Sequence, residues 1–202
     1  MIDTRVWREI RKRLNNPRFS TINHRDGCFG IMNFGFRAED DLILLLELSS
    51  NFNAGLGTHE SSRDLQEPSH WLYKANEQGL INSYCYYSEA GLVISLIESC
   101  LIGQIGATVK VRAQGQPIMD VLFGTSNSCL LITVSPDNLI AFQDMAATNQ
   151  NPVSVIGRVG GDSLSVSVAS KQWDDPEEQE IIHLSLKELE DEWKSSSSPK
   201  MD

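Results

Sequence analysis

The stretch SYCYYSEAGLVISLIESC, residues 83–100, joins a tyrosine-rich, strand-like half to an apolar, helix-like half and decides how the rest of the chain is interpreted. It predicts a strand over 81–87 and a helix over 89–102 that ends at Gly103. The helix is apolar nearly all round, which indicates packing on more than one side. A strand that turns directly into a helix points free backbone N–H groups at one place, where phosphate often binds. The turn after Ser88 is therefore a candidate anion site.

The remaining pattern predicts alternating helices and strands. Further helices are expected over 3–16, 71–81 and 136–147, the last with Ser135 as its N-cap, and Ser185 and Glu188 form a capping box that opens a helix to Trp193. Strands are expected over 41–48, 107–113 and 127–135, and residues 153–168 are predicted to form a hairpin that turns at Gly160, Gly161 and Asp162. Helices alternating with strands, plus a hairpin, favour an α+β fold with a mixed sheet.

Charge and composition limit the classes of function. The net charge of −10 and a pI near 4.8 predict a surface that repels nucleic acid and anionic membranes, so neither is an expected partner. Residues 1–25 nevertheless hold seven Lys and Arg, which we interpret as a solvated helix face or arm, with RNA or an acidic partner as the alternative. The four cysteines form no CxxC pair, no signal peptide or membrane span is recognised, and a reduced cytoplasmic protein is predicted.

Three segments, taken in order, resemble one enzyme family. Residues 120–166 are similar to the closing section of phosphoribosylformylglycinamidine synthase, with its FGES-like turn, its "P…IGxV" strand and its glycine turn. Residues 83–98 resemble the family's SAHDxSxGGLxxxLxE motif, and residues 32–61 resemble its MDFK…GDxIxLLG…ELGGSEY segment. The resemblance covers roughly residues 26–194 and implies the carboxy-terminal domain that this family shares with aminoimidazole ribonucleotide (AIR) synthase.

The resemblance also implies a fold, a reaction and a set of site residues. The fold is a layered α/β/α domain, partly ferredoxin-like. In the family, ATP activates a formyl amide and ammonia then displaces the phosphate to give an amidine, so ATP, magnesium and a ribonucleotide of purine synthesis are implied by the family alone. The positions that match its substrate and phosphate motifs are Ser88, Gly91, Gly57, Glu60, Gly124 and Ser126.

Several motif residues depart from the family pattern. Cys85 and Tyr86 stand where the family has His-Asp, Ala90 replaces the first glycine of a Gly-Gly pair, and Gly35 replaces the lysine of MDFK. Fold-forming positions are kept, whereas charges and close-approach glycines that a polyanion needs are lost. Because each charge-assisted contact is worth roughly 1.5–3 kcal/mol, the remaining site is expected to be vestigial, with no catalytic residue and no cofactor assigned.

Other candidate residues have simpler interpretations. Cys85 could be a nucleophile, but a buried strand thiol is favoured. His59 with Glu60 could bind a metal or act as a base, but a solvated loop pair is favoured, and no metal site is predicted. The tyrosines Tyr84, Tyr86 and Tyr87 could stack on a base or pack across strands. The acidic run 174–180 is interpreted as a solvated loop rather than a cation site.

These observations predict three parts and three alternative functions. The parts are a basic arm over 1–25, the AIR-synthase-type domain over 26–194 and a disordered tail over 195–202. The leading hypothesis is a free-standing domain of this type without catalysis of its own. The alternatives are a subunit that works with a separate ATP-binding half, and a module that binds a metabolite or protein; a homodimer is a further possible assembly.

Overall fold

The computed structural model describes residues 3–15, 35–47, 70–86, 91–124, 129–169 and 178–197. Its helices are α1 (Thr4–Leu14), α2 (His70–Glu77), α3 (Leu92–Gly103), α4 (Ile118–Phe123), the 3-10 helix η3 (Pro136–Asn138), α5 (Leu139–Thr148) and α6 (Leu186–Ser197). Its strands are β1 (Leu42–Glu47), β2 (Ser83–Tyr86), β3 (Ala107–Arg112), β4 (Cys129–Val134), β5 (Val153–Val159), β6 (Ser163–Ala169) and β7 (Glu178–Ser185).

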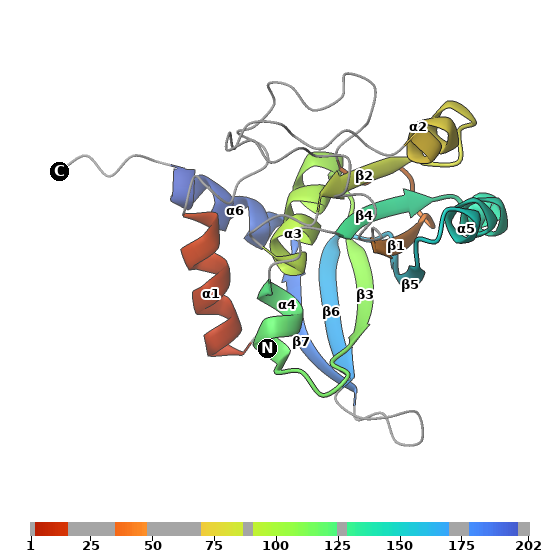
Figure 1. Cartoon of the computed structure of the whole chain (residues 1–202). Coiled ribbons are helices and arrows are strands. Elements are labelled where there is room, and N and C mark those ends of the chain that lie inside the picture. Colours follow the sequence, from red (N-terminus) through yellow and green to blue (C-terminus); the bar gives the residue numbers. More distant parts are fainter. Residues whose placement is uncertain are drawn as a thin grey trace, which may run out of the picture.

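All seven strands form one mixed sheet in the order β2-β4-β1-β5-β3-β6-β7. Every neighbouring pair is antiparallel except β3 and β6, which run parallel. Figure 1 shows α1, α3, α4 and α6 gathered on one side of the molecule and α2 and α5 at the other end of the sheet. The predicted α+β class with a mixed, helix-layered sheet is confirmed.

Two hydrophobic clusters lie on the two faces of the sheet. The larger cluster joins α1, α3, α4 and α6 to side chains from all seven strands. The smaller cluster joins α2 and α5 to β1, β2 and β4, where the rings of Trp71 and Phe142 lie 6.0 Å apart. Strand β3 shows that the face with the smaller cluster is only partly covered. Its side chains alternate, so that Thr108, Lys110 and Arg112 are exposed while the residues between them are buried.

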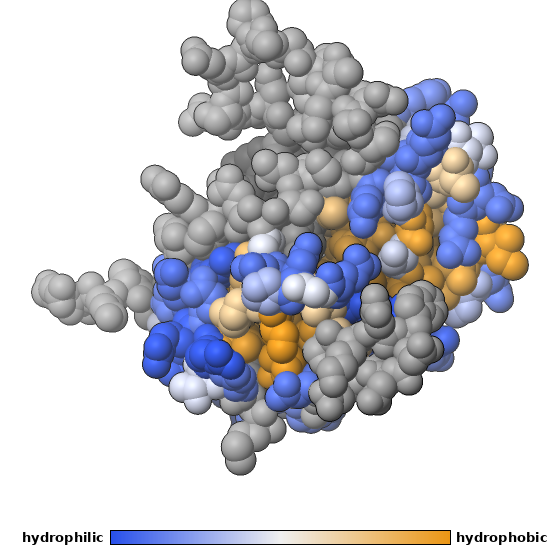
Figure 2. Space-filling view, turned by 60° about the horizontal axis from the view of Figure 1, so that its bottom comes forward, coloured by the Kyte–Doolittle hydropathy of each residue, from blue (hydrophilic) through white to orange (hydrophobic). Residues whose placement is uncertain are grey.

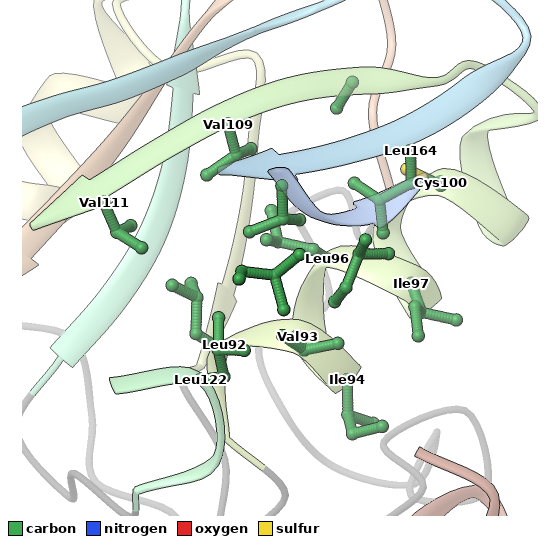
Figure 3. Packing of buried hydrophobic residues seen from close by; sticks show 14 of the residues in the cluster. Leu92, Val93, Ile94, Leu96, Ile97, Cys100, Val109, Val111, Leu122 and Leu164 are labelled. Atoms are coloured by element: carbon green, nitrogen blue, oxygen red, sulfur yellow. The ribbon is translucent and has the colours of Figure 1, made fainter. Parts of the chain in front are cut away.

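Helix α3 is the centre of the larger cluster. Its residues from Leu92 to Cys100 are all buried, including the polar Ser95 and Glu98. Figure 3 shows Leu96 on the side of α3 that faces the sheet, and Ile94 on the side nearer the dark red ribbon of α1. The all-round apolar composition predicted such a helix, and its packing on several sides explains that composition.

The predicted hairpin over 153–168 is wrong. Strands β5 and β6 follow one another in the sequence, but β3 lies between them and pairs with both. The Gly160–Gly161 turn is present, and it wraps around the start of β3 through two hydrogen bonds of 2.8 Å, Gly106 N–H to Gly161 C=O and Gly160 N–H to Gly106 C=O. Turn residues indicate only that the chain reverses direction. The chain reverses in the same way in a hairpin and in two strands that have a third strand between them.

The predicted helix boundaries fare better. The Ser135 hydroxyl accepts a hydrogen bond from the Asp137 N–H, so Ser135 is the expected cap, although the first turn is the 3-10 helix η3. The capping box is also present, because the Glu188 carboxylate accepts from the Ser185 N–H at 2.8 Å. Helix α6 extends to Ser197, beyond the predicted end at Trp193 and into the segment expected to be disordered. Helix α4 was not predicted.

In the part of the chain that the structure describes, none of the helices has the length and apolarity needed to cross a membrane.

Candidate functional site at the start of α3

The structure describes two of the six predicted site residues. Gly91 is the N-cap of α3, and Gly124 directly follows α4. The two glycines lie at the same corner of the molecule, because the backbone of Phe123 packs against Gly91. Ser88, Gly57, Glu60 and Ser126 lie outside the described residues, as do His59 and the acidic run up to residue 177.

Gly91 is required for packing within the domain. Its φ of +86° is a conformation that L side chains rarely adopt. A Cβ at this position would lie 2.6 Å from the Phe123 Cα and 3.0 Å from the Leu122 carbonyl oxygen. The bare side of the glycine therefore faces the last turn of α4, and this contact explains the glycine without a ligand.

The first turn of α3 is closed to solvent. Leu92, Val93 and Ile94 are 2%, 0% and 1% exposed, and Gly91 provides no side-chain cap. An anion can use the N-terminal amides of a helix only if it can reach them. Although the helix dipole is present, its positive end lies inside the protein in this structure.

Gly124 is also constrained by α4. Its N–H donates a 2.7 Å hydrogen bond to the Asp120 carbonyl oxygen, and an added Cβ would overlap that same oxygen. The glycine of the FGES-like turn thus ends α4 by close backbone contact.

Gly35, a further departure from the family pattern, packs closely against α3. Gly35, at the position of the family's MDFK lysine, has a φ of +90°. A Cβ there would lie 2.5 Å from Cγ2 and 2.7 Å from Cβ of Ile102. Restoring a long cation at this position would require α3 or the segment before β1 to shift.

Cys85 is a buried strand thiol, as favoured from the sequence. It is 4% exposed, and burial raises its pKa to about 12, with the negative charge of Glu98 adding to the rise and a hydrogen bond involving Ser95 opposing it. A thiol with this pKa stays protonated near neutral pH and is a poor nucleophile. The position that holds histidine in the family therefore supplies no acid–base group here.

Arg13 of α1 lies at the same corner and was not identified from the sequence. Its Nη1 donates a 2.8 Å hydrogen bond to the Phe123 carbonyl oxygen, and its guanidinium lies 5.1 Å from the centroid of the Phe123 ring. Its Nε also donates to the Glu9 carboxylate at 2.8 Å. The sequence alone indicates only the i,i+4 pair of Arg13 with Glu9, which is typical of a solvated helix face, and it does not indicate the contact with Phe123.

Most other cations of α1 have acidic neighbours. Arg5 pairs with Asp3, Lys12 with Glu9, and Arg11 with Glu192 of α6 at 2.8 Å. The pairs of Arg5 and Lys12 are typical of a solvated helix face, whereas the pair of Arg11 connects α1 to α6.

Asp41 is a buried carboxylate next to an inner strand of the sheet. Asp41, just before β1, is 2% exposed; its Oδ1 accepts a 2.8 Å hydrogen bond from Asn82, while its Oδ2 has no hydrogen-bond partner. Burial raises its pKa above the ordinary value, and the Asn82 hydrogen bond opposes that rise. This group is a candidate for pH-dependent stability.

A surface hollow of about 430 Å³ lies where α5 turns into β5. It is lined by Gln143, Ala147, Gln150, Asn151, Pro152 and Val153. None of the predicted site residues lines it.

The described residues do not fit the ATP and magnesium that the family resemblance implies. Among them, no group of three or more His, Cys, Asp or Glu is arranged to hold a metal ion. The helix terminus that would meet a phosphate is buried, as shown above. No catalytic step can be derived from these residues.

The fold and the strand–helix corner define the class of this protein. Residues 39–169 match the family described as AIR synthase related protein, C-terminal domain. Because the match covers more than half of the chain, the chain belongs to this family, as the sequence motifs predicted.

The individual relatives are subunits of one synthase. The chain is 29% identical over 175 residues to the phosphoribosylformylglycinamidine synthase subunit PurL of Moorella thermoacetica, covering 80% of this chain and 23% of the relative. It is 33% identical over 135 residues to the PurL subunit of Caldanaerobacter subterraneus, covering 67% of this chain and 17% of the relative. The chain thus spans about a fifth of the length of these curated relatives.

A solved structure, T. maritima PurL complexed with ADP, has the same fold. It matches with a TM-score of 0.58 at 14% sequence identity, covering 85% of this chain and 28% of that chain.

Proposed function

We propose that this chain is a PurL-type carboxy-terminal domain, related to purine biosynthesis, that does not bind ATP or catalyse amidine formation by itself. The observation that supports this proposal most is the closed first turn of α3. There Gly91 packs against Phe123, and Leu92, Val93 and Ile94 are buried. Of the retained motif residues, Gly91 and Gly124 are described, and both have a role in packing. Of the changed ones, Cys85 and Gly35 are described, and they supply neither an acid–base group nor a cation.

An activity assay tests this proposal directly. The full chain is supplied with ATP, magnesium, formylglycinamide ribonucleotide and ammonia, and amidine formation is followed together with ADP release. The PurL subunit of Moorella thermoacetica, assayed in parallel, is the positive control. We expect no product above the level without protein. Turnover by this chain alone would contradict the proposal.

A second candidate function is a subunit of a split synthase, in which another polypeptide supplies an ATP-binding half. The observation that favours it is that both relatives named above are subunits of a synthase. The test is co-expression of this chain with the ATP-binding segment of a PurL relative, followed by co-purification and the same assay. A stable complex that forms amidine supports the split-subunit function, and the absence of a complex removes it.

A further inference from the structure

Helix α1 lies outside the segment that matches the family, which begins at residue 39. In the structure it packs on α3 and α6 of the domain, with Val6, Ile10 and Leu14 buried at a spacing of four residues. Figure 1 shows α1 beside α6 and close to α4. The domain therefore has a groove between α3, α4 and α6 that accepts a helix.

Two polar contacts set the direction of the helix in this groove. Arg11 reaches Glu192 of α6, with its Nε 2.8 Å from the carboxylate. Arg13, one half-turn further on, donates to the Phe123 carbonyl oxygen at the end of α4. Phe123 is also the residue whose backbone packs on Gly91, so Arg13 connects α1 to the corner that contains the candidate site.

An eleven-residue helix is short for a stable helix in water. Isolated helices of fewer than about 12–15 residues are marginal, so α1 depends on the groove for its order. Its apolar stripe is also narrow, since the residues between the buried positions include Arg8, Arg11 and Lys12. The order of α1 therefore depends on the contacts that Val6, Ile10 and Leu14 make within the larger cluster.

We propose that the groove between α3, α4 and α6 is a docking site for a basic amphipathic helix, and that α1 is a strap that occupies it in this chain. The matching helix has aliphatic residues four apart and an arginine placed to meet the Phe123 carbonyl. While α1 is docked, it braces α4 against Gly91 and the start of α3. This inference stands independently of the absence of catalysis proposed above.

Hydrogen exchange on the full chain tests the strap. Arg13→Ala is compared with Arg8→Ala, since Arg8 is exposed on the same helix. We expect exchange of the α1 amides to rise about ten- to a hundredfold in Arg13→Ala, the change expected for loss of a charge-assisted hydrogen bond. Exchange in β3 and β6 should stay at the wild-type rate in both variants, and α1 should be unaffected by Arg8→Ala. Equal effects of the two variants, or α1 exchange only together with β3 and β6, would overturn the proposal.

Binding of the helix as a separate peptide is the second test. A labelled peptide of residues 3–15 is titrated into the full chain and into the full-length variant Ile10→Asp, whose own α1 is unseated. We expect binding to Ile10→Asp, little binding to the wild type because its groove is occupied, and about tenfold weaker binding of the peptide with Arg13→Ala. Two results would contradict a docking groove. One is equal binding of the wild-type and Arg13→Ala peptides to Ile10→Asp. The other is no binding to Ile10→Asp although its β3 and β6 amides remain protected from hydrogen exchange. If Ile10→Asp does not fold, the exchange comparison of Arg13→Ala with Arg8→Ala decides.

Discussion

Glycine has two different roles in this protein, and Gly91 and Gly115 separate them. Both residues have positive φ, +86° and +83°. A Cβ at Gly91 would meet the backbone of Phe123, whereas a Cβ at Gly115 would meet nothing within 4 Å. Gly115 is thus a glycine only for its backbone conformation, while Gly91 is also a glycine for close approach between α3 and α4.

Substitution of the two glycines measures this difference. We expect Gly115→Ala to lower the free energy of unfolding by about 1–2 kcal/mol, the cost of a left-handed conformation. Gly91→Ala should cost roughly 2–5 kcal/mol, because displacement of α4 adds to the strain. Urea unfolding of the two variants gives the comparison. A Gly91→Ala variant no less stable than Gly115→Ala would show that the contact with Phe123 is not tight.

Asp41 should make the stability depend on pH in the direction opposite to a salt-bridged carboxylate. Burial raises its pKa in the folded state above 3.8, so the folded state holds the proton more tightly than the unfolded state. Its contribution is greatest below pH 3.8 and declines as the pH rises through the raised folded pKa. We expect Asp41→Asn to remove this decline. The measurement is the free energy of unfolding at several pH values from acid to neutral for both proteins; identical pH profiles would rule out a raised pKa at Asp41.

At the scale of elements, the capping box shows how a local sequence signal becomes structure. The Ser185 hydroxyl and N–H both donate to the Glu188 carboxylate, at 2.7 and 2.8 Å, and the Glu188 N–H donates back to the hydroxyl at 3.3 Å. All three bonds lie within four consecutive residues, so the sequence alone could predict them.

Loss of this cap should destabilise α6 by a modest amount. We expect Ser185→Ala to lower the free energy of unfolding by about 0.5–2 kcal/mol. Ser154→Ala on the exposed side of β5 is the matched control and should change it by less than about 0.5 kcal/mol. Thermal unfolding followed by circular dichroism distinguishes the two. Equal melting temperatures for Ser185→Ala and the wild type would mean that the cap makes no net contribution.

Elements with a long or periodic pattern were predictable, and short ones were not. Helix α3 was identified because a long, mainly apolar run ends at Gly103. Helix α4 was missed because six residues are too few to show a helical period. Its role is nevertheless large, since it supplies the backbone that closes the space beside Gly91.

At the scale of the whole molecule, sheet order was the part that local patterns could not predict. The Gly160–Gly161 turn has the appearance of a hairpin, but the space between its two strands is filled by β3, which is more than forty residues earlier in the sequence. Turn chemistry specifies how the chain reverses and says nothing about a third strand inserted from elsewhere. The layered arrangement around the sheet was predictable only through the family resemblance.

Of the predicted site residues, the structure describes Gly91 and Gly124, and their arrangement could not be predicted from the sequence. The motifs located Gly91 and Gly124, and the lost charges suggested a site without function. Burial of the first turn of α3 and the contact of Arg13 with Phe123 depend on α1 and α4 meeting at one corner, which no local pattern contains. Figure 2 shows one face of the molecule, on which hydrophobic areas lie among hydrophilic residues.

The central claim is that the start of α3 is closed and does not receive a nucleotide's phosphates. The amide resonances of Gly91, Leu92 and Val93 report this directly when the full chain is titrated with ATP and magnesium. A final ATP concentration of about 10 mM is high enough to detect binding with a millimolar dissociation constant. The account predicts that these resonances do not move, while T. maritima PurL, for which a complex with ATP has been solved, binds ATP under the same conditions. Saturable shifts of the three amides in this chain would contradict it.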